Sequence, residues 1–195
     1  MKYIFLDFDG VINNWDHFDG VAKENAIILK RIIDISGAMV VVTSSNKYVL
    51  QCNSGIDYYS SNFYNAYVKE LNEFGIQIFD LTPMCGRNRS LEIKKYILDH
   101  NVSDYVIVDD ELVNFELQDH QVFLDLYRGL QVEHIKPIIS ILNGKLGFYP
   151  PNYDRLETAE ELNFRINKYK FFVFGNDNKR LVNICVLMFS YCFSF

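Results

Sequence analysis

Short apolar runs alternate along this chain with longer segments of helical spacing, and no other feature constrains the fold as strongly. The apolar runs, which read as buried strands, are residues 3–6, 38–42, 76–79, 105–108 and 122–126. The segments with helical spacing are residues 22–35, 64–74, 90–100 and 132–142. Strands that alternate with helices form a parallel sheet with helices on both faces. We therefore expect an α/β fold, a three-layer α/β/α sandwich with a mainly parallel sheet.

The character of the chain changes near Pro150, so we expect two parts. The 195 residues fit a domain at 1–149 and a C-terminal appendage at 150–195, formed by a helix and an apolar hairpin or tail. The stretch 181–195 is almost wholly apolar, but it is shorter than the roughly 20 residues that span a bilayer. We expect no membrane span, and a tail that packs in the core or mediates self-association or binding of a protein partner.

Charge and cysteine usage narrow the function classes. The formal charge is −6, so the whole chain lacks the basic character of a general nucleic-acid binder, although a local basic patch is compatible with it. The four cysteines show no CxxC spacing, which argues against a zinc site or a disulfide framework. The N-terminus lacks the apolar stretch of a signal peptide. These features predict a cytoplasmic protein with reduced thiols.

Polar side chains follow three of the expected strands. The pairs are Asp7 and Asp9 after the first strand, Thr43 and Ser44 after the second, and Asp109 and Asp110 after the fourth. The carboxyl ends of parallel strands share one edge of a sheet, where ligands bind in such folds. Several carboxylates close together repel unless a cation or a shared proton relieves them. An all-oxygen cluster suits Mg²⁺, and Mg²⁺ suits phosphoryl transfer.

The residue types at this edge fit a phosphoryl-transfer reaction. A carboxylate can act as the nucleophile, and a second one can protonate the leaving oxygen and then activate water. Gly10 would allow a sharp turn with room for a phosphate. The hydroxyl of Thr43 and the amide of Ser44 would bind the phosphoryl group. Arg89, at the start of a helix, would balance the charge of the transition state, with Arg87 as the weaker candidate.

Four segments, in order, resemble the motifs of the haloacid dehalogenase (HAD) superfamily of phosphohydrolases. These are "FLDFDGVIN", "VVVTSSN", "RSLEIKKYI" and "YVIVDDE", and their detail resembles small HAD domains associated with RNA-repair proteins over roughly residues 1–143. The resemblance implies a Rossmann-like core, with Asp7 as nucleophile and Asp9 as general acid/base. It implies Mg²⁺ held by the Asp7 carboxylate, the Asp9 main-chain carbonyl and Asp110, with Asp109 beside them. It places Thr43 on the phosphoryl group and Arg89 where lysine is usual.

The spacing of the motifs leaves little room for a cap domain. Only 33 residues separate Asp9 from Thr43, and residues 47–85 hold a tyrosine-rich stretch, one helix and one strand. An open site favours a large phosphorylated substrate, either a nucleic-acid end or a phosphoprotein. The tyrosines of 55–67 would either stack on bases or pack the loop. We therefore expect a Mg²⁺-dependent phosphatase. The alternatives are a phosphatase for nucleotides or small metabolites and a catalytically silent HAD-fold binding module.

Overall fold

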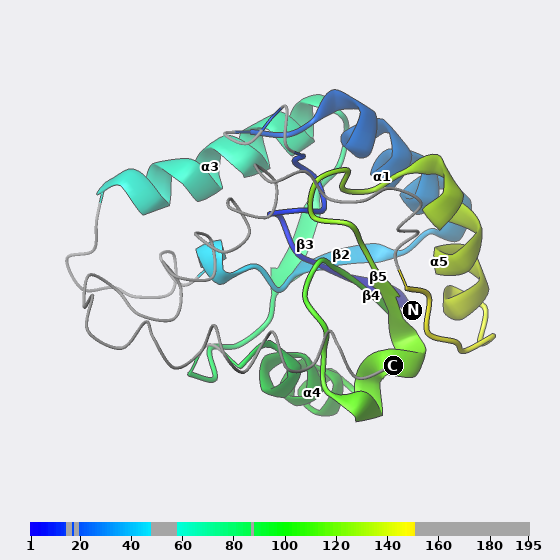
Figure 1. Cartoon of the computed structure of the whole chain (residues 1–195). Coiled ribbons are helices and arrows are strands. Elements are labelled where there is room, and N and C mark those ends of the chain that lie inside the picture. Colours follow the sequence, from blue (N-terminus) through cyan, green and yellow to red (C-terminus); the bar gives the residue numbers. More distant parts are fainter. Residues whose placement is uncertain (15–16, 18–19, 48–57, 87, 151–195) are drawn as a thin grey trace, which may run out of the picture. The chain divides into compact units, whose positions relative to one another are not determined.

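The computed structural model describes residues 1–14, 17, 20–47, 58–86 and 88–150 (Figure 1). Almost all of the expected appendage at 150–195 therefore lies outside the described residues. The elements follow one another as β1 (Lys2–Leu6), α1 (Lys23–Ser36), β2 (Met39–Val42), η1 (Ser45–Lys47), α3 (Tyr58–Glu73), β3 (Ile78–Leu81), α4 (Arg89–His100), β4 (Asp104–Asp109), η2 (Phe115–His120), β5 (Gln121–Phe123), η3 (Val132–His134) and α5 (Ile135–Leu142).

The five strands form one parallel sheet in the order β3-β2-β1-β4-β5. The central strand β1 pairs Leu6 with Val42 on one side and with Val108 on the other. Hydrogen bonding continues past the strand ends: the N–H of Thr43 donates to the Leu6 carbonyl at 2.8 Å, and that of Asp7 donates to the Val108 carbonyl at 3.1 Å. The residues that follow these strands are thus fixed by the sheet itself.

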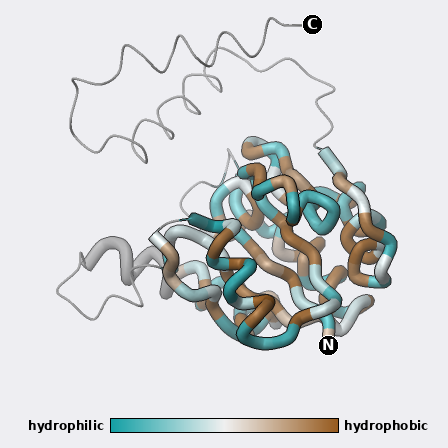
Figure 2. The backbone as a smooth tube through the Cα atoms, turned by 90° about the horizontal axis from the view of Figure 1, so that it is seen from below, coloured by the Kyte–Doolittle hydropathy of each residue, from teal (hydrophilic) through white to brown (hydrophobic). Residues whose placement is uncertain are grey.

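Side chains of the central strands alternate between two separate apolar cores. Ile4 and Leu6 face the core that includes side chains of α1, α3 and α5, whereas Tyr3 and Phe5 face the core built with α4. Figure 1 shows these helices on opposite faces of the sheet, and Figure 2 shows hydrophobic strand segments inside the body. Successive strand residues point to opposite faces, so both faces are buried. The predicted three-layer α/β/α sandwich is confirmed.

The segment around β3 differs from the prediction. The helix α3 begins at Tyr58, six residues before the predicted start at 64, and β3 begins at Ile78 rather than at Ile76. Gly75 ends α3 with φ +71°, and the N–H of Ile76 donates to the Leu71 carbonyl at 3.0 Å. This bond pattern is the Schellman motif, in which an apolar residue after the glycine packs back on the helix. Ile76 is buried as part of this helix end and precedes the strand.

The end of β5 and the start of α5 also differ from the prediction, each for a local reason. The strand β5 ends at Phe123, not at residue 126, because Asp125 starts a turn in which its side chain accepts the Tyr127 N–H at 2.8 Å. The helix α5 starts at Ile135 after the short η3, so Pro137 lies in its first turn. A proline is tolerated there because the first N–H groups of a helix have no intrahelical acceptor.

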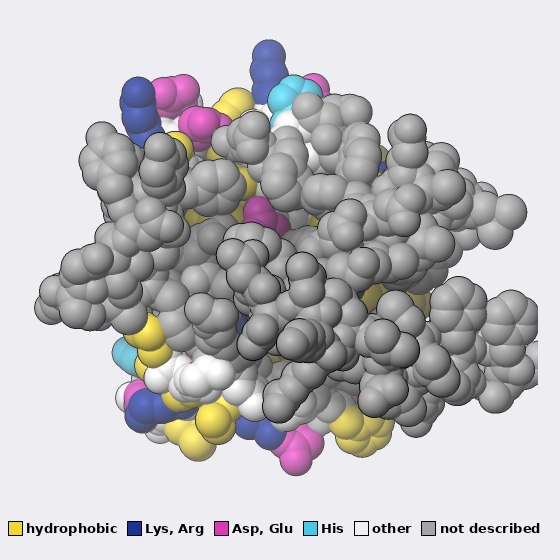
Figure 3. Space-filling model, turned by 60° about the vertical axis from the view of Figure 1, so that its left-hand side comes forward, with side chains coloured by type: hydrophobic (Ala, Val, Ile, Leu, Met, Phe, Trp, Pro, Cys, Tyr) yellow, Lys and Arg dark blue, Asp and Glu magenta, His cyan; other side chains and the backbone are white. Residues whose placement is uncertain are grey.

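Between the strands, the described residues hold no inserted domain. One helix, α1, connects β1 to β2, and the described part of the β2–β3 connection contains only η1 and α3. None of the described helices has the length and apolar character needed to cross a membrane. On the face shown in Figure 3, the visible described side chains carry both signs of charge. Because no domain is inserted between the described strands, loops and helix ends form the carboxyl edge of the sheet.

Candidate active site

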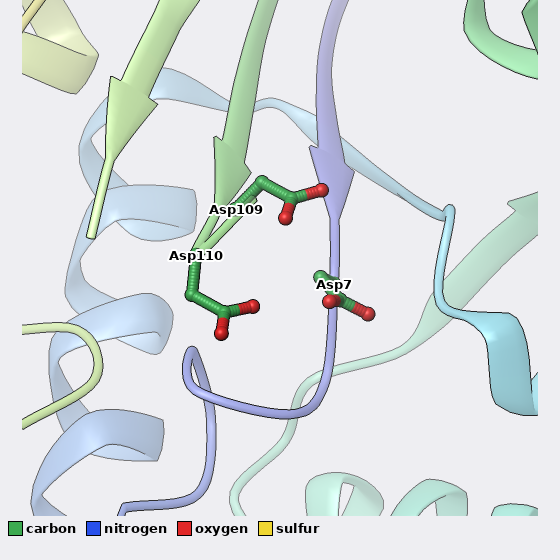
Figure 4. A group of neighbouring side chains, drawn as sticks. All are labelled: Asp7, Asp109 and Asp110. Atoms are coloured by element: carbon green, nitrogen blue, oxygen red, sulfur yellow. The ribbon is translucent and has the colours of Figure 1, made fainter. Parts of the chain in front are cut away.

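Three carboxylates gather at the carboxyl ends of the neighbouring strands β1 and β4. Asp7 follows β1, Asp109 is the last residue of β4, and Asp110 comes next. Each offers an oxygen atom, and these three atoms lie within 4.8 Å of one another. Figure 4 shows the side chains of Asp109 and Asp110 extending from β4 towards β1. All three residues of this acidic trio are buried. They are three of the four carboxylates that the sequence places at this edge; the carboxylate of Asp9, the fourth, is not in this group.

Arg89, the first residue of α4, supplies a positive charge to this trio. Its Nη1 atom lies 2.8 Å from Asp7 Oδ2 and 2.6 Å from each carboxylate oxygen of Asp109. The helix start is fixed by Asn88, whose side chain accepts the Leu91 N–H at 3.0 Å. Among the described residues, Arg89 is thus the cation that contacts the acidic trio, while Arg87 lies outside them.

The electrostatics of the trio fit a divalent cation. Burial opposes the charge of Arg89, but the carboxylates of Asp109 and Asp7 raise the pKa of its guanidinium well above its ordinary value. Burial raises the pKa of Asp109 well above its usual range, and Arg89 opposes that shift. Three carboxylates against one guanidinium leave an excess of negative charge in a buried place. Hard oxygen ligands with such an excess suit Mg²⁺.

Gly10 is needed for the close approach of the first loop to Asp110. Its φ is +70°, and a Cβ atom added there would lie 2.7 Å from Asp110 Cγ. The Gly10 N–H donates to Asn13 Oδ1 at 2.6 Å. The sequence predicted that Gly10 makes room for a phosphate; instead, the space beside it holds a carboxylate and its amide binds Asn13. Glycine is required here by the positive φ and by the Asp110 side chain.

Asp9 has a different environment from the trio. Its carboxylate is partly exposed and accepts a hydrogen bond from Asn13 Nδ2 at 2.9 Å. The hydroxyl of Tyr67 lies 3.5 Å from the same oxygen, Asp9 Oδ1. Tyr67, the last of the tyrosines considered for base stacking, is buried and stacks on Phe8 at 4.9 Å between ring centroids. It therefore packs against the first loop; the side chains of the earlier tyrosines lie outside the described residues.

Thr43 and Ser44 are both buried at the end of β2. The Thr43 Oγ1 atom has no hydrogen-bond partner among the described residues. A buried hydroxyl without a partner costs free energy unless a ligand or water satisfies it. This orphaned hydroxyl fits a phosphoryl oxygen as its partner.

A buried ion pair behind the site was missed from the sequence. Lys47 Nζ lies 2.5 Å from Glu92 Oε2 and 3.1 Å from the Thr43 carbonyl oxygen, and Glu92 Oε1 accepts the Cys85 N–H at 3.1 Å. The pair thus ties the loop after β2 to α4, the helix that carries Arg89. Lys47 follows Thr43 by four residues and Glu92 follows Arg89 by three, but nothing in that spacing indicates that a lysine is fully buried.

A parallel α/β sandwich with an acidic trio and one basic side chain at the carboxyl edge is the arrangement of the HAD superfamily. The chain belongs to the family described as HAD domain in Swiss Army Knife RNA repair proteins, whose family model matches residues 3–135. The match covers all four motifs and ends at the first residue of α5. No curated protein and no solved structure matches the chain.

Proposed function

We propose that the protein is a Mg²⁺-dependent phosphatase that hydrolyses a phosphate monoester through a phosphorylated Asp7. The observation that carries this proposal is the contact of Arg89 with both Asp7 and Asp109 inside a buried acidic trio. A carboxylate beside a fixed positive charge is oriented for attack, and the same charge stabilises the phosphoryl oxygens in the transition state. The family match supports a phosphohydrolase.

Asp7 is the proposed nucleophile. Its Oδ1 atom accepts the Phe8 N–H at 2.8 Å, and its Oδ2 atom accepts from Arg89. A carboxylate oxygen of Asp7 forms a bond to phosphorus while the bond from phosphorus to the leaving oxygen breaks. Asp9 gives its proton to that leaving oxygen. Asp9 then takes a proton from water, whose oxygen attacks phosphorus and releases inorganic phosphate and Asp7.

The buried acidic trio supports the proposed Mg²⁺ ligands, and the Asp9 main-chain carbonyl is added to them from the resemblance to HAD proteins. Asp7, Asp110 and the main-chain carbonyl of Asp9 would hold the ion, with Asp109 beside them. When bound, Mg²⁺ neutralises phosphoryl oxygens and orients the phosphate for in-line attack. Thr43, with its unsatisfied hydroxyl, and the amide of Ser44 would bind the phosphoryl oxygens.

We propose a nucleic-acid end as the phosphate carrier. Two observations support it: the family is named for RNA-repair proteins, and the described residues contain no inserted domain that would close over a small substrate. A cytoplasmic location and a C-terminal segment that binds a partner or a second copy of the chain are proposals that accompany it.

The test is a substrate panel with the purified full chain and Mg²⁺. We expect slow hydrolysis of p-nitrophenyl phosphate that is lost in Asp7→Asn, and faster turnover of a 3′-phosphorylated oligonucleotide than of the matching mononucleotide. Equal or better turnover of the mononucleotide would favour the small-substrate phosphatase. If no phosphate monoester is hydrolysed, the protein is a binding module.

A further inference from the structure

The side chain of Asn13 joins the first loop to a helix far along the sequence. Its Oδ1 atom accepts the Gly10 N–H at 2.6 Å, and its Nδ2 atom lies 2.9 Å from Asp9 Oδ1 and 2.7 Å from the Tyr67 hydroxyl oxygen. Asn13 is only 1% exposed. Buried, mutually hydrogen-bonded polar groups hold one geometry more firmly than exposed ones.

Tyr67 completes this arrangement from α3. Its hydroxyl accepts from Asn13 and lies 3.5 Å from Asp9 Oδ1, while its ring stacks on Phe8 with an interplanar angle of 23°. Burial, together with the negative charge of Asp9, raises the pKa of the Tyr67 hydroxyl far above its ordinary value. The hydroxyl therefore keeps its proton and can donate it in a hydrogen bond.

The side-chain donors identified at the two carboxylates of the first loop come from different elements. Asp7 accepts from the permanently charged Arg89, whereas the donors identified at Asp9 Oδ1 are the neutral side chains of Asn13 and Tyr67. The hydrogen bonds from Asn13 and Tyr67 orient the Asp9 carboxylate, and a group that gives and takes a proton at a defined place needs a fixed orientation.

We infer that Asn13 and Tyr67 are positioning residues for Asp9 in its proposed role as general acid/base. Both donors converge on Oδ1 and thereby fix the orientation of the Asp9 carboxylate. This inference rests on the proposed phosphatase function. It assigns a purpose to the position of α3: the helix places Tyr67 against the loop that carries the acid.

The test compares two substrates that differ in their need for an acid. A dinitrophenyl phosphate has a good leaving group and needs little protonation, whereas glycerol phosphate has an alkoxide leaving group and needs it strongly. The parameter is kcat/KM, because it reports the steps up to phosphorylation of Asp7. We expect Tyr67→Phe to lower kcat/KM for glycerol phosphate about tenfold and for the dinitrophenyl ester by less than about twofold.

Tyr96→Phe is the matched control. Tyr96 is equally buried, its hydroxyl donates to Asp80 Oδ2 at 2.9 Å, and it belongs to α4 and packs in the other core. We expect Tyr96→Phe to change neither kcat/KM value.

Asn13→Asp is a second test variant, because it keeps the acceptor for Gly10 and removes the donor to Asp9. We expect it to lower kcat/KM for glycerol phosphate more than Tyr67→Phe does. An equal loss on both substrates in Tyr67→Phe, or no loss, would overturn the inference while leaving the phosphatase proposal intact. If the unaltered protein hydrolyses neither substrate, the proposed function fails and the inference fails with it.

Discussion

Arg89 contacts Asp7 through a single nitrogen atom, Nη1, which lies 2.8 Å from Asp7 Oδ2. The same atom also contacts both carboxylate oxygens of Asp109. The guanidinium therefore acts at this site much as a point charge would, rather than as a two-pronged fork. This geometry explains how arginine can occupy a position where the resemblance to HAD proteins leads one to expect lysine.

We predict that Arg89→Lys and Arg89→Met differ sharply. The lysine variant keeps a charged nitrogen near Asp7, so we expect kcat for an aryl phosphate to fall by no more than about tenfold. The methionine variant removes the charge, and we expect kcat to fall by about 100-fold or more. Steady-state kinetics with both variants measures this. Equal loss in the two variants would show that the shape of the guanidinium matters and that its charge alone does not suffice.

We predict that Mg²⁺ stabilises the protein through the acidic trio. A ligand that binds only the folded state raises stability by about 2.7 kcal/mol at 100 times its dissociation constant. Thermal unfolding with Mg²⁺ or with a chelator should therefore give a higher melting temperature with Mg²⁺. In Asp110→Asn, which lacks one of the three carboxylates, we expect most of this increment to disappear. An unchanged increment would place the ion elsewhere.

We predict that Gly10→Ala harms the site as well as the fold, with Gly37→Ala as its control. Both glycines have positive φ, so alanine at either should cost about 1 kcal/mol of backbone strain. Only at Gly10 would the new Cβ meet Asp110; at Gly37 nothing lies within 4 Å. Thermal unfolding should show destabilisation in both variants, and the Mg²⁺ increment should shrink only in Gly10→Ala. A shrunken increment in both would contradict the local explanation.

We predict that the buried Lys47–Glu92 pair behaves differently from a surface pair. Lys47→Met leaves a buried carboxylate without its cation, which should cost about 3–5 kcal/mol. Adding Glu92→Gln to Lys47→Met removes that charge and keeps an acceptor for the Cys85 N–H, so the double variant should regain part of the lost stability. The control is Lys95→Met, which breaks an exposed, solvent-screened pair with Asp99 and should cost far less stability than Lys47→Met. Urea unfolding measures the stability of the unaltered protein, of Lys47→Met with and without Glu92→Gln, and of Lys95→Met. Similar losses of stability in Lys47→Met and Lys95→Met would refute the difference between a buried and an exposed pair.

The sequence was sufficient to predict how the main site residues meet. Asp7 and Thr43 each follow a strand and Asp109 ends one, and the parallel pairing of β1 with β2 and β4 brings these strand ends to one edge. Arg89 could be predicted as well, because its place at a helix start after β3 puts it at the same edge. These predictions depend only on the order of strands and helices, which periodicity reveals.

The supporting residues could not be predicted in this way. Tyr67 reaches Asn13 because of the rotation of α3 on the sheet, and that rotation depends on packing rather than on sequence order. Lys47 is buried although lysine is among the residues least often buried, so composition argues against its position. The shift of β3 follows from the helix end at Gly75, where an apolar residue serves the helix instead of the strand.

The central claim is that Asp7 becomes phosphorylated during Mg²⁺-dependent turnover. The direct measurement is a rapid acid quench of the full chain with Mg²⁺ and an aryl phosphate, followed by mass spectrometry of the peptide that contains Asp7. We predict the added mass of one phosphoryl group on that peptide, its accumulation in Asp9→Asn, and its absence in Asp7→Asn. Release of inorganic phosphate by Asp7→Asn at the rate of the unaltered protein would contradict the account.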